Sequence, residues 1–253
     1  MNYVGIYTLA KKEIKRFMRV PFQTLGQPVV TTVLYFLVFG YAIGNRIGAI
    51  EGISYGEFIM PGLIMMNIVI TAFSGVSFGL LFPKIMNTIS DILVSPMSYT
   101  EIALGFTIAS VLRSMVVGAL IYLTALFFIP ARIDHALFLI FFTVLVAATF
   151  SLFGIIIGIW AENFEQISIF PTFLIMPLSF LGGVFYSIDM LPPIAKTISM
   201  YNPFLYMISG MRYGFYGFSD VSPIVAIAIV GVLTLALLIF VSYLLKTGYK
   251  LRN

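Results

Sequence analysis

Six long apolar stretches separated by short polar connections constrain this chain more than any other feature. They cover residues 27–44, 58–82, 102–129, 136–160, 167–186 and 224–245. A stretch of roughly 17 to 25 apolar residues is enough for one α-helix to cross the hydrocarbon core of a bilayer. Arg113 is the one charged residue inside these stretches, and all ten carboxylates lie outside them. The sequence therefore predicts an all-α integral membrane protein with six transmembrane helices in a single domain, 1–253.

The composition excludes most soluble classes of protein and most site chemistry. Hydrophobic residues make up 60% of the chain and charged residues 9%, whereas soluble proteins carry roughly 25% charged residues. The absence of cysteine excludes disulfides, thiolate metal sites and cysteine nucleophiles, and His135 is the single histidine. Zinc-protease and serine-hydrolase motifs are missing too. We expect a transport permease and not an enzyme, with no catalytic residue and no metal site.

The distribution of lysine and arginine predicts the orientation. An even number of spans puts both termini on one side, and cytoplasmic segments are enriched in these cations. With cytoplasmic termini, nine cations lie inside and four outside. The inner ones are Lys11, Lys12, Lys15, Arg16, Arg19, Lys84, Lys246, Lys250 and Arg252, and the outer ones are Arg46, Arg132, Lys196 and Arg212. The first apolar run starts too far from the N-terminus for a cleavable signal peptide, so we expect the N-terminus to be retained.

The segment before the first span has the pattern of an amphipathic helix. Its apolar positions recur every three or four residues, at Tyr3, Tyr7, Ala10, Ile14 and Phe17. The cations fall on other faces, and Pro21 separates the segment from the first span. We expect an interfacial helix whose cations face anionic headgroups, with a moving gate element as the alternative.

The connection between the second and third spans, Pro83 to Thr100, contains a short helical pattern that ends at Pro96. Ile85, Ile89, Ile92 and Leu93 share one face of it, with polar residues such as Asp91 between them. A short helix of this kind can fit a groove in a cytoplasmic partner. It can equally lie on the lipid headgroups, and the residues alone leave both interpretations open.

No phosphate-cradling loop is present, and no segment outside the spans is long enough for a nucleotide-binding domain. Energy for transport must therefore come from a partner or from a gradient. Arg113 would cost about 2.5 to 3.5 kcal/mol if it faced lipid, so we expect it to point into protein or water. It is a candidate polar contact on a substrate path, and the alternative is a structural hydrogen bond to neighbouring helices.

The outer segment from Ser187 to Pro223 is rich in aromatic residues and breaks at Asn202–Pro203 into two short amphipathic pieces. Backbone that dips to membrane depth without spanning is tolerated where protein covers it, so we expect a re-entrant segment. Its aromatic side chains either form an interfacial belt or stack on sugar or lipid groups. They are Tyr201, Phe204, Tyr206, Tyr213, Phe215, Tyr216 and Phe218.

A set of residues in the last third of the chain resembles the signature of the type-2 ABC exporter permeases. The set starts at Ile175, Leu178, Leu181 and Val184, and its other members are Gly182, Leu191, Pro192, Pro203, Tyr206 and Arg212. The resemblance extends over the whole chain and includes the PGLIMM run at 61–66 and the DILVSPMS run at 91–98. The layout is similar to that of bacterial polysaccharide and drug exporters.

The resemblance implies a permease of the bacterial cytoplasmic membrane that forms a dimer and binds two copies of a separate ATPase. That ATPase would bind ATP and Mg²⁺, and this chain would bind no cofactor and no nucleic acid. The 83–96 segment would be the coupling helix that contacts the ATPase, through Ile85, Ile89, Asp91, Ile92 and Leu93. The substrate would be amphiphilic, such as a lipid-linked glycan, a lipid or a drug, and it would move outward. The alternative function is a gradient-driven carrier or channel without an ATPase, which the lack of an intramembrane carboxylate disfavours.

Overall fold

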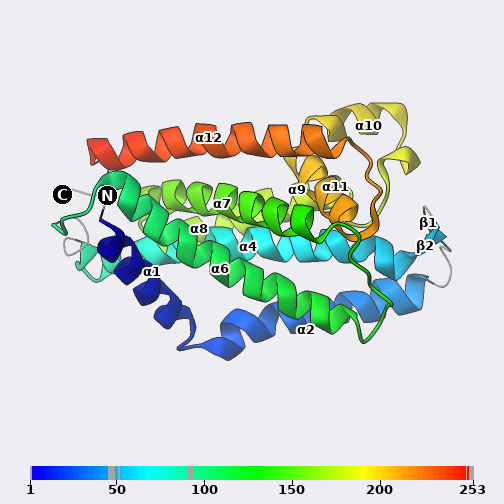
Figure 1. Cartoon of the computed structure of the whole chain (residues 1–253), viewed down its shortest axis with the longest axis horizontal. Helices are drawn as coiled ribbons and strands as arrows, with labels where there is room; N and C mark the ends of the chain where they lie inside the picture. Colours follow the sequence, from blue (N-terminus) through cyan, green and yellow to red (C-terminus); the bar gives the residue numbers. More distant parts are fainter. Residues whose placement is uncertain (1, 45–48, 51, 90–93, 249, 251–253) are drawn as a thin grey trace.

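The structure is a computed structural model of the chain that describes residues 2–44, 49–50, 52–89, 94–248 and 250. Helices dominate it (Figure 1). The elements are α1 (Tyr3–Phe17), η1 (Phe22–Gly26), α2 (Gln27–Tyr35), η2 (Phe36–Ile43), β1 (Ala49–Ile50), β2 (Ile53–Ser54), α4 (Tyr55–Ile85), α6 (Tyr99–Ala125), α7 (Ala136–Trp160), α8 (Phe164–Phe170), η3 (Pro171–Ile175), α9 (Met176–Leu181), η4 (Ile188–Met190), α10 (Pro193–Met200), α11 (Pro203–Tyr216) and α12 (Pro223–Thr247). The segments η1, η2 and η3 are π-helical. The strands β1 and β2 pair antiparallel.

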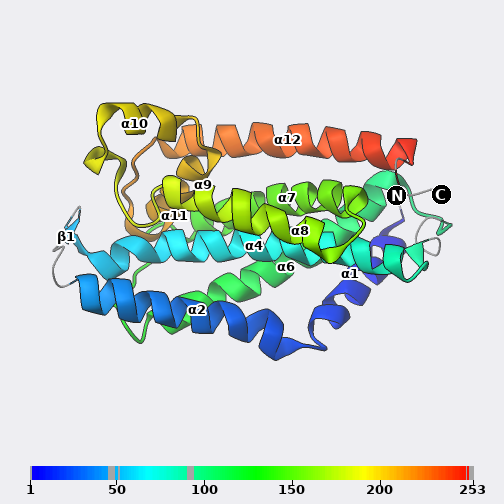
Figure 2. The same cartoon turned by 180° about the vertical axis from the view of Figure 1, so that it is seen from behind.

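Among the described residues, six helices are long and apolar enough to cross a membrane, in agreement with the six predicted from the sequence. They are Phe22–Gly40, Tyr55–Ile85, Tyr99–Ala125, Ala136–Trp160, Phe164–Leu181 and Pro223–Thr247. The longest of them, α4, α6, α7 and α12, extend along the long axis of the molecule in both views (Figures 1 and 2). The fold is that of an all-α integral membrane protein.

Two of these helices start before their apolar runs because polar side chains cap them. At α4, the Ser54 hydroxyl accepts from the Glu57 amide, and the Glu57 carboxylate accepts from the Ser54 amide at 2.9 Å. Ser98 and Glu101 form the same capping box at α6, with an amide-to-carboxylate distance of 2.7 Å. Such boxes satisfy amide groups of the first turn, which have no partner within the helix. The helices therefore begin at Tyr55 and Tyr99.

Several helix ends also differ from the predicted bounds, and two of the differences have a clear origin or consequence. The fifth span ends at Leu181 and not at Tyr186, because the chain turns at Gly183, whose φ of +89° favours glycine. The second span continues through Pro83 to Ile85. Pro83 is therefore part of α4 and does not begin the connection that follows it.

The helix α4 forms the centre of the core. It packs against α6, α7 and α11, and most of its side chains are buried. Its approach to α7 is close: a Cβ atom added at Gly154 would lie 2.6 Å from the Phe73 carbonyl oxygen, and the Ser77 hydroxyl donates to the Gly154 carbonyl at 3.0 Å. Small residues allow this contact between two apolar spans.

The two termini lie at the same end of the molecule, as six spans require (Figure 1). The helix α1 starts there, where the Asn2 amide donates to the Glu101 carboxylate at 2.6 Å and the Asn2 side chain donates to the Pro96 carbonyl at 3.1 Å. It then packs along the first half of α6, with Leu9 against Gly105. The hairpin β1–β2 lies at the opposite end (Figure 1).

The amphipathic helix α1 is rotated relative to the face predicted from the sequence. Its buried residues are Ile6, Leu9, Ala10, Glu13 and Phe17. Tyr3 and Tyr7, placed on the apolar face by the sequence argument, are exposed. Gly79 of α4 and Gly105 of α6 leave room for α1, and the Glu13 carboxylate lies in this contact. A hydropathy pattern cannot indicate such a contact.

The outer segment forms two helices, α10 and α11, that meet at Asn202 as predicted. The Asn202 side chain caps α11 and also donates to the Leu178 carbonyl at 2.7 Å. Three of its seven aromatic side chains, Phe204, Phe215 and Tyr216, are buried in the core and so lie outside an interfacial belt, whereas Tyr201 is exposed. They are buried because α11 packs inward against α4, α7 and α12.

Candidate functional site

A groove of about 450 Å³ runs between the first and fifth spans, over the face of α4. Polar side chains and apolar ones share its lining. The polar residues are Arg16, Gln23, Thr24, Gln27, Thr31, Asn67, Thr71, Ser74 and Arg113, and the larger apolar ones are Phe17, Tyr35, Met66, Ile70, Phe78, Phe82 and Met176. No aspartate or glutamate of the described residues lines it. Its surface therefore suits an amphiphilic or anionic molecule.

The two spans that border this groove are poorly covered by the rest of the chain. In the most apolar 18-residue stretch of each span, 11% of the residues of the first span and 17% of those of the fifth are buried, whereas 78% are buried in α4. Figure 2 shows α2 and α8 on one face of the molecule, on either side of α4. Both spans also contain π-helical turns, in η1 and η2 of the first and η3 of the fifth. Such turns are rare and occur often at functional sites.

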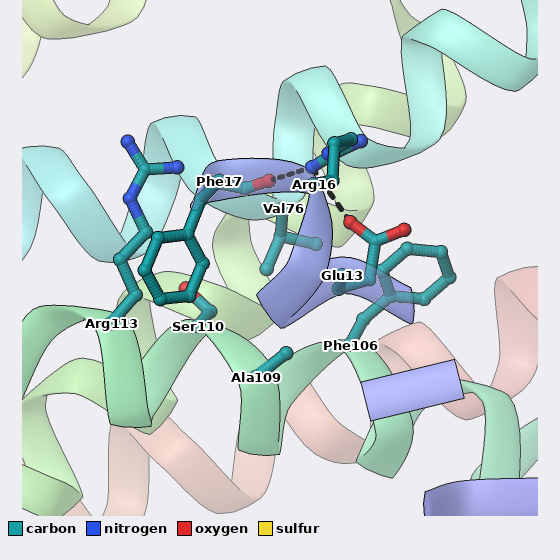
Figure 3. Close-up of a pocket in the computed structure, with 9 residues that line it drawn as sticks. Glu13, Arg16, Phe17, Val76, Phe106, Ala109, Ser110 and Arg113 are labelled. Atoms are coloured by element: carbon teal, nitrogen blue, oxygen red, sulfur yellow. Dashed lines mark hydrogen bonds and ion pairs between the residues drawn. The ribbon is translucent and has the colours of Figure 1, made fainter. Parts of the chain in front are cut away.

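Arg113, in the middle of α6, borders the groove and has few partners. Its Nε atom is buried, and no described residue accepts a hydrogen bond from its guanidinium. The Phe17 ring lies beside it, with its centroid 5.7 Å from the guanidinium carbon (Figure 3). A Cβ atom added at Gly75 would lie 3.5 Å from Nη1, so this glycine of α4 gives the guanidinium room. The structural hydrogen bond considered for Arg113 is absent among the described residues.

A second arginine, Arg16 of α1, lines the same groove but is paired. Its Nη2 lies 2.7 Å from a Glu13 carboxylate oxygen and donates to the Gly75 carbonyl at 2.9 Å (Figure 3). Burial raises the pKa of Glu13, while Arg16 and then Lys12 act against that shift. Burial likewise lowers the pKa of Arg16, and Glu13 opposes this. The sequence analysis missed Glu13, whose only signal is a carboxylate one turn before an arginine.

The residues assigned to the coupling helix are described in part. Ile85 is the last residue of α4 and is exposed, and Ile89 is half-buried. Asp91, Ile92 and Leu93 lie outside the described residues. The end of α4 is anchored by Lys84, whose Nζ donates to the Ile159 and Ala161 carbonyls at 2.8 and 2.9 Å.

The residues that carry the family resemblance gather around the turn after the fifth span. Arg212 is fully buried, and its Nη1 donates to Asp220 at 2.7 Å, its Nη2 to the Gly183 carbonyl. The Asp220 carboxylate also accepts from Ser187 at 2.8 Å. A Cβ atom at Gly182 would lie 2.9 Å from that of Phe204.

Four more of these residues shape α10 and α11. Pro192 precedes the first turn of α10, and Leu191 follows the last residue of η4. Pro203 is the first residue of α11, and the Tyr206 hydroxyl donates to the Met200 carbonyl at 2.9 Å. Together with the Arg212 contacts, they hold the outer segment against the end of the fifth span. Within the described ranges, no three His, Asp or Glu side chains gather to hold a metal ion.

Comparison with known proteins confirms the resemblance seen in the sequence. Residues 4–216 match the family model described as ABC-2 type transporter. The chain is 41% identical over 253 residues to the inner membrane transport permease YadH of Escherichia coli (strain K12), covering 100% of this chain and 99% of the relative. It is 23% identical over 185 residues to nodulation protein J of Rhizobium leguminosarum bv. viciae, covering 71% and 70% of the two chains. The chain therefore belongs to the ABC-2 type transporter family.

Proposed function

We propose that this chain is the permease subunit of an ATP-driven exporter in the bacterial inner membrane, and that two copies assemble with a separate cytoplasmic ATPase. ATP and Mg²⁺ bind the ATPase in this proposal, because the chain has no phosphate-binding loop. The E. coli relative is named an inner membrane transport permease, which supports the location. The excess of cations at the end that holds both termini supports cytoplasmic termini.

The observation that carries the proposal is the groove between the first and fifth spans. Exposure of its polar side chains to lipid would cost free energy. The spans on either side of the groove are mostly not covered by the rest of the chain. A second copy placed on this face buries both spans and encloses two grooves as one pathway. The last span is also poorly covered, but it lies on the far side of α7 (Figure 1) and in this arrangement faces lipid.

The lining of the groove supports an amphiphilic substrate. Glutamine, threonine and asparagine side chains offer hydrogen bonds to a polar group, and the aromatic and methionine side chains suit an apolar one. A lipid, a lipid-linked glycan or an amphiphilic drug has both parts. The outward direction of transport rests on the similarity to exporters.

Coupling to the ATPase is assigned to the segment that follows α4. It lies at the end of the molecule that holds both termini (Figure 1), and Ile85 and Ile89 are the described members of its apolar face. The Asn2 side chain is bonded to the Pro96 carbonyl in the same connection. We therefore expect a movement of this connection to displace α1 and, with it, the Arg16 side chain at the groove.

Copurification of the permease with a cytoplasmic ATPase from the same cells tests the proposal. Ile85→Glu removes the exposed apolar side chain of this face and should release the ATPase or abolish substrate-stimulated hydrolysis, while the permease still inserts in the membrane. Thr88→Glu adds the same charge at another exposed position of the connection and serves as the control. Transport by the purified permease without any ATPase would contradict the proposal and favour a gradient-driven carrier.

A further inference from the structure

The charges around the groove do not balance. Arg16 is paired with Glu13 at 2.7 Å, whereas Arg113 forms no ion pair with the described residues. Arg113 is half-buried, with its Nε atom buried, and a cation partly withdrawn from water without a partner is destabilising. The groove therefore has one uncompensated positive charge at the level of α1, α4 and α6.

Space and hydrogen-bond donors for an anion are present next to this charge. The Arg113 guanidinium lies at the wall of the 450 Å³ groove, and Gln23, Gln27 and Asn67 line the same groove. Gly75 on α4 leaves room beside Nη1. Apolar side chains share the walls of the groove, among them Met66, Ile70 and Phe78 of α4.

We propose that Arg113, with Arg16 beside it, binds the phosphate of an amphiphile's headgroup while the apolar tail lies along the groove. A guanidinium offers several donors in a fork that matches phosphate oxygens. The inference rests on the proposed function, since it names the class of substrate that the transport groove accepts. A membrane amphiphile fits better than free phosphate because apolar side chains share the walls of the groove with the polar ones.

The competing explanation is structural: Arg113 is held by its contact with the Phe17 ring and contributes to packing alone. The two explanations predict opposite effects on stability. Replacing an unpartnered cation by a neutral side chain of similar length stabilises the lipid-free protein, whereas removing a packing contact destabilises it.

Lipid binding to the purified full-length permease in neutral detergent tests the proposal. Native mass spectrometry would compare phosphatidic acid with diacylglycerol of the same chains, which lacks the phosphate. We expect preferential binding of phosphatidic acid, about tenfold weaker in Arg113→Gln and largely retained in Arg113→Lys. Arg19→Gln removes an exposed cation just after the end of α1 and should leave binding unchanged.

Three results would overturn the inference. One is equal binding of phosphatidic acid by Arg113→Gln and the wild type. Another is displacement of phosphatidic acid by an equal concentration of inorganic phosphate, which would show a site for the free anion. The third is a lower melting temperature of lipid-free Arg113→Met. All are measured without the ATPase, so they leave ATPase copurification, and with it the proposed function, independently testable.

Discussion

Two arginines in helices of this protein have opposite surroundings. Arg212 in α11 is fully buried, and both of its terminal nitrogens are bonded, to Asp220 and to the Gly183 carbonyl. The Phe58 ring lies 3.8 Å from its guanidinium carbon. Arg113 in α6 borders an open groove, and no described residue accepts a hydrogen bond from it.

The difference separates a structural charge from one that is available for binding. Arg212 joins the turn after the fifth span to the segment after α11, so its loss would release both. Arg113 joins nothing through hydrogen bonds, and it lies where a ligand can reach it. Burial agrees with this distinction, because Arg212 is fully buried whereas Arg113 is half-buried.

The largest expected effect is that of breaking the Arg212 pair. Arg212→Met leaves the Asp220 carboxylate buried without its cation, and loss of one partner of a buried pair costs about 3 to 5 kcal/mol. We expect a large drop in melting temperature, or failure to purify as a single species. Arg132→Met is the control, because its contact with Asp134 is long, at 3.6 Å, and exposed. Equal effects of the two substitutions would contradict the structural role.

Substitution of the glycine beside the Arg212 site should also have a different effect from substitution of the glycine beside Arg16, the second arginine of the groove. Alanine at Gly182 places Cβ 3.0 Å from the Leu178 carbonyl oxygen and close to Phe204, so backbone must move. We expect a cost of about 1 to 3 kcal/mol. Alanine at Gly79 places Cβ 2.8 Å from Nη2 of Arg16, the end of a flexible side chain next to the groove.

Gly79→Ala should therefore lower stability less than Gly182→Ala. Thermal unfolding in detergent, followed by circular dichroism, compares the two variants directly. A larger loss of stability for Gly79→Ala would mean that the Arg16 site is at least as rigid as the Arg212 site.

The smallest expected effect concerns the pH dependence at Glu13. Burial raises the pKa of this carboxyl in the folded protein, so between its ordinary pKa and the raised one the folded state binds more protons than the unfolded state. Stability therefore falls as pH rises through that interval. Glu13→Gln should remove this part of the dependence, and the difference is measured as melting temperature against pH. Parallel profiles for the two proteins would show that Glu13 titrates normally.

The sequence predicted the spans because their signal is strong: long apolar runs and one charge among them. It also placed the break at Asn202–Pro203, where a proline starts α11. The starts of α4 and α6 were less accurate because they depend on the Ser54 and Ser98 capping boxes. Hydropathy cannot detect such caps.

The site was predictable only in part. Arg113 was identified as a lone charge in an apolar span, and Arg212 through the family resemblance. The pairing of Arg212 with Asp220 depends on how the outer segment folds back, and the burial of Glu13 depends on which face of α1 meets α4 and α6. Both are tertiary contacts that leave little trace in local sequence.

Disulfide cross-linking tests most directly the claim that the groove face meets a second copy. The chain has no cysteine, so single cysteines can be placed at Val30 in α2, at Phe173 in η3 and, as a control, at Val232 in α12, all exposed in the single chain. Under mild oxidation in native membranes, we expect linked dimers when Val30 and Phe173 are replaced, singly or together, and none for the control. Cross-linking through position 232, with none at 30 or 173, would place the second copy on α12 and contradict the account.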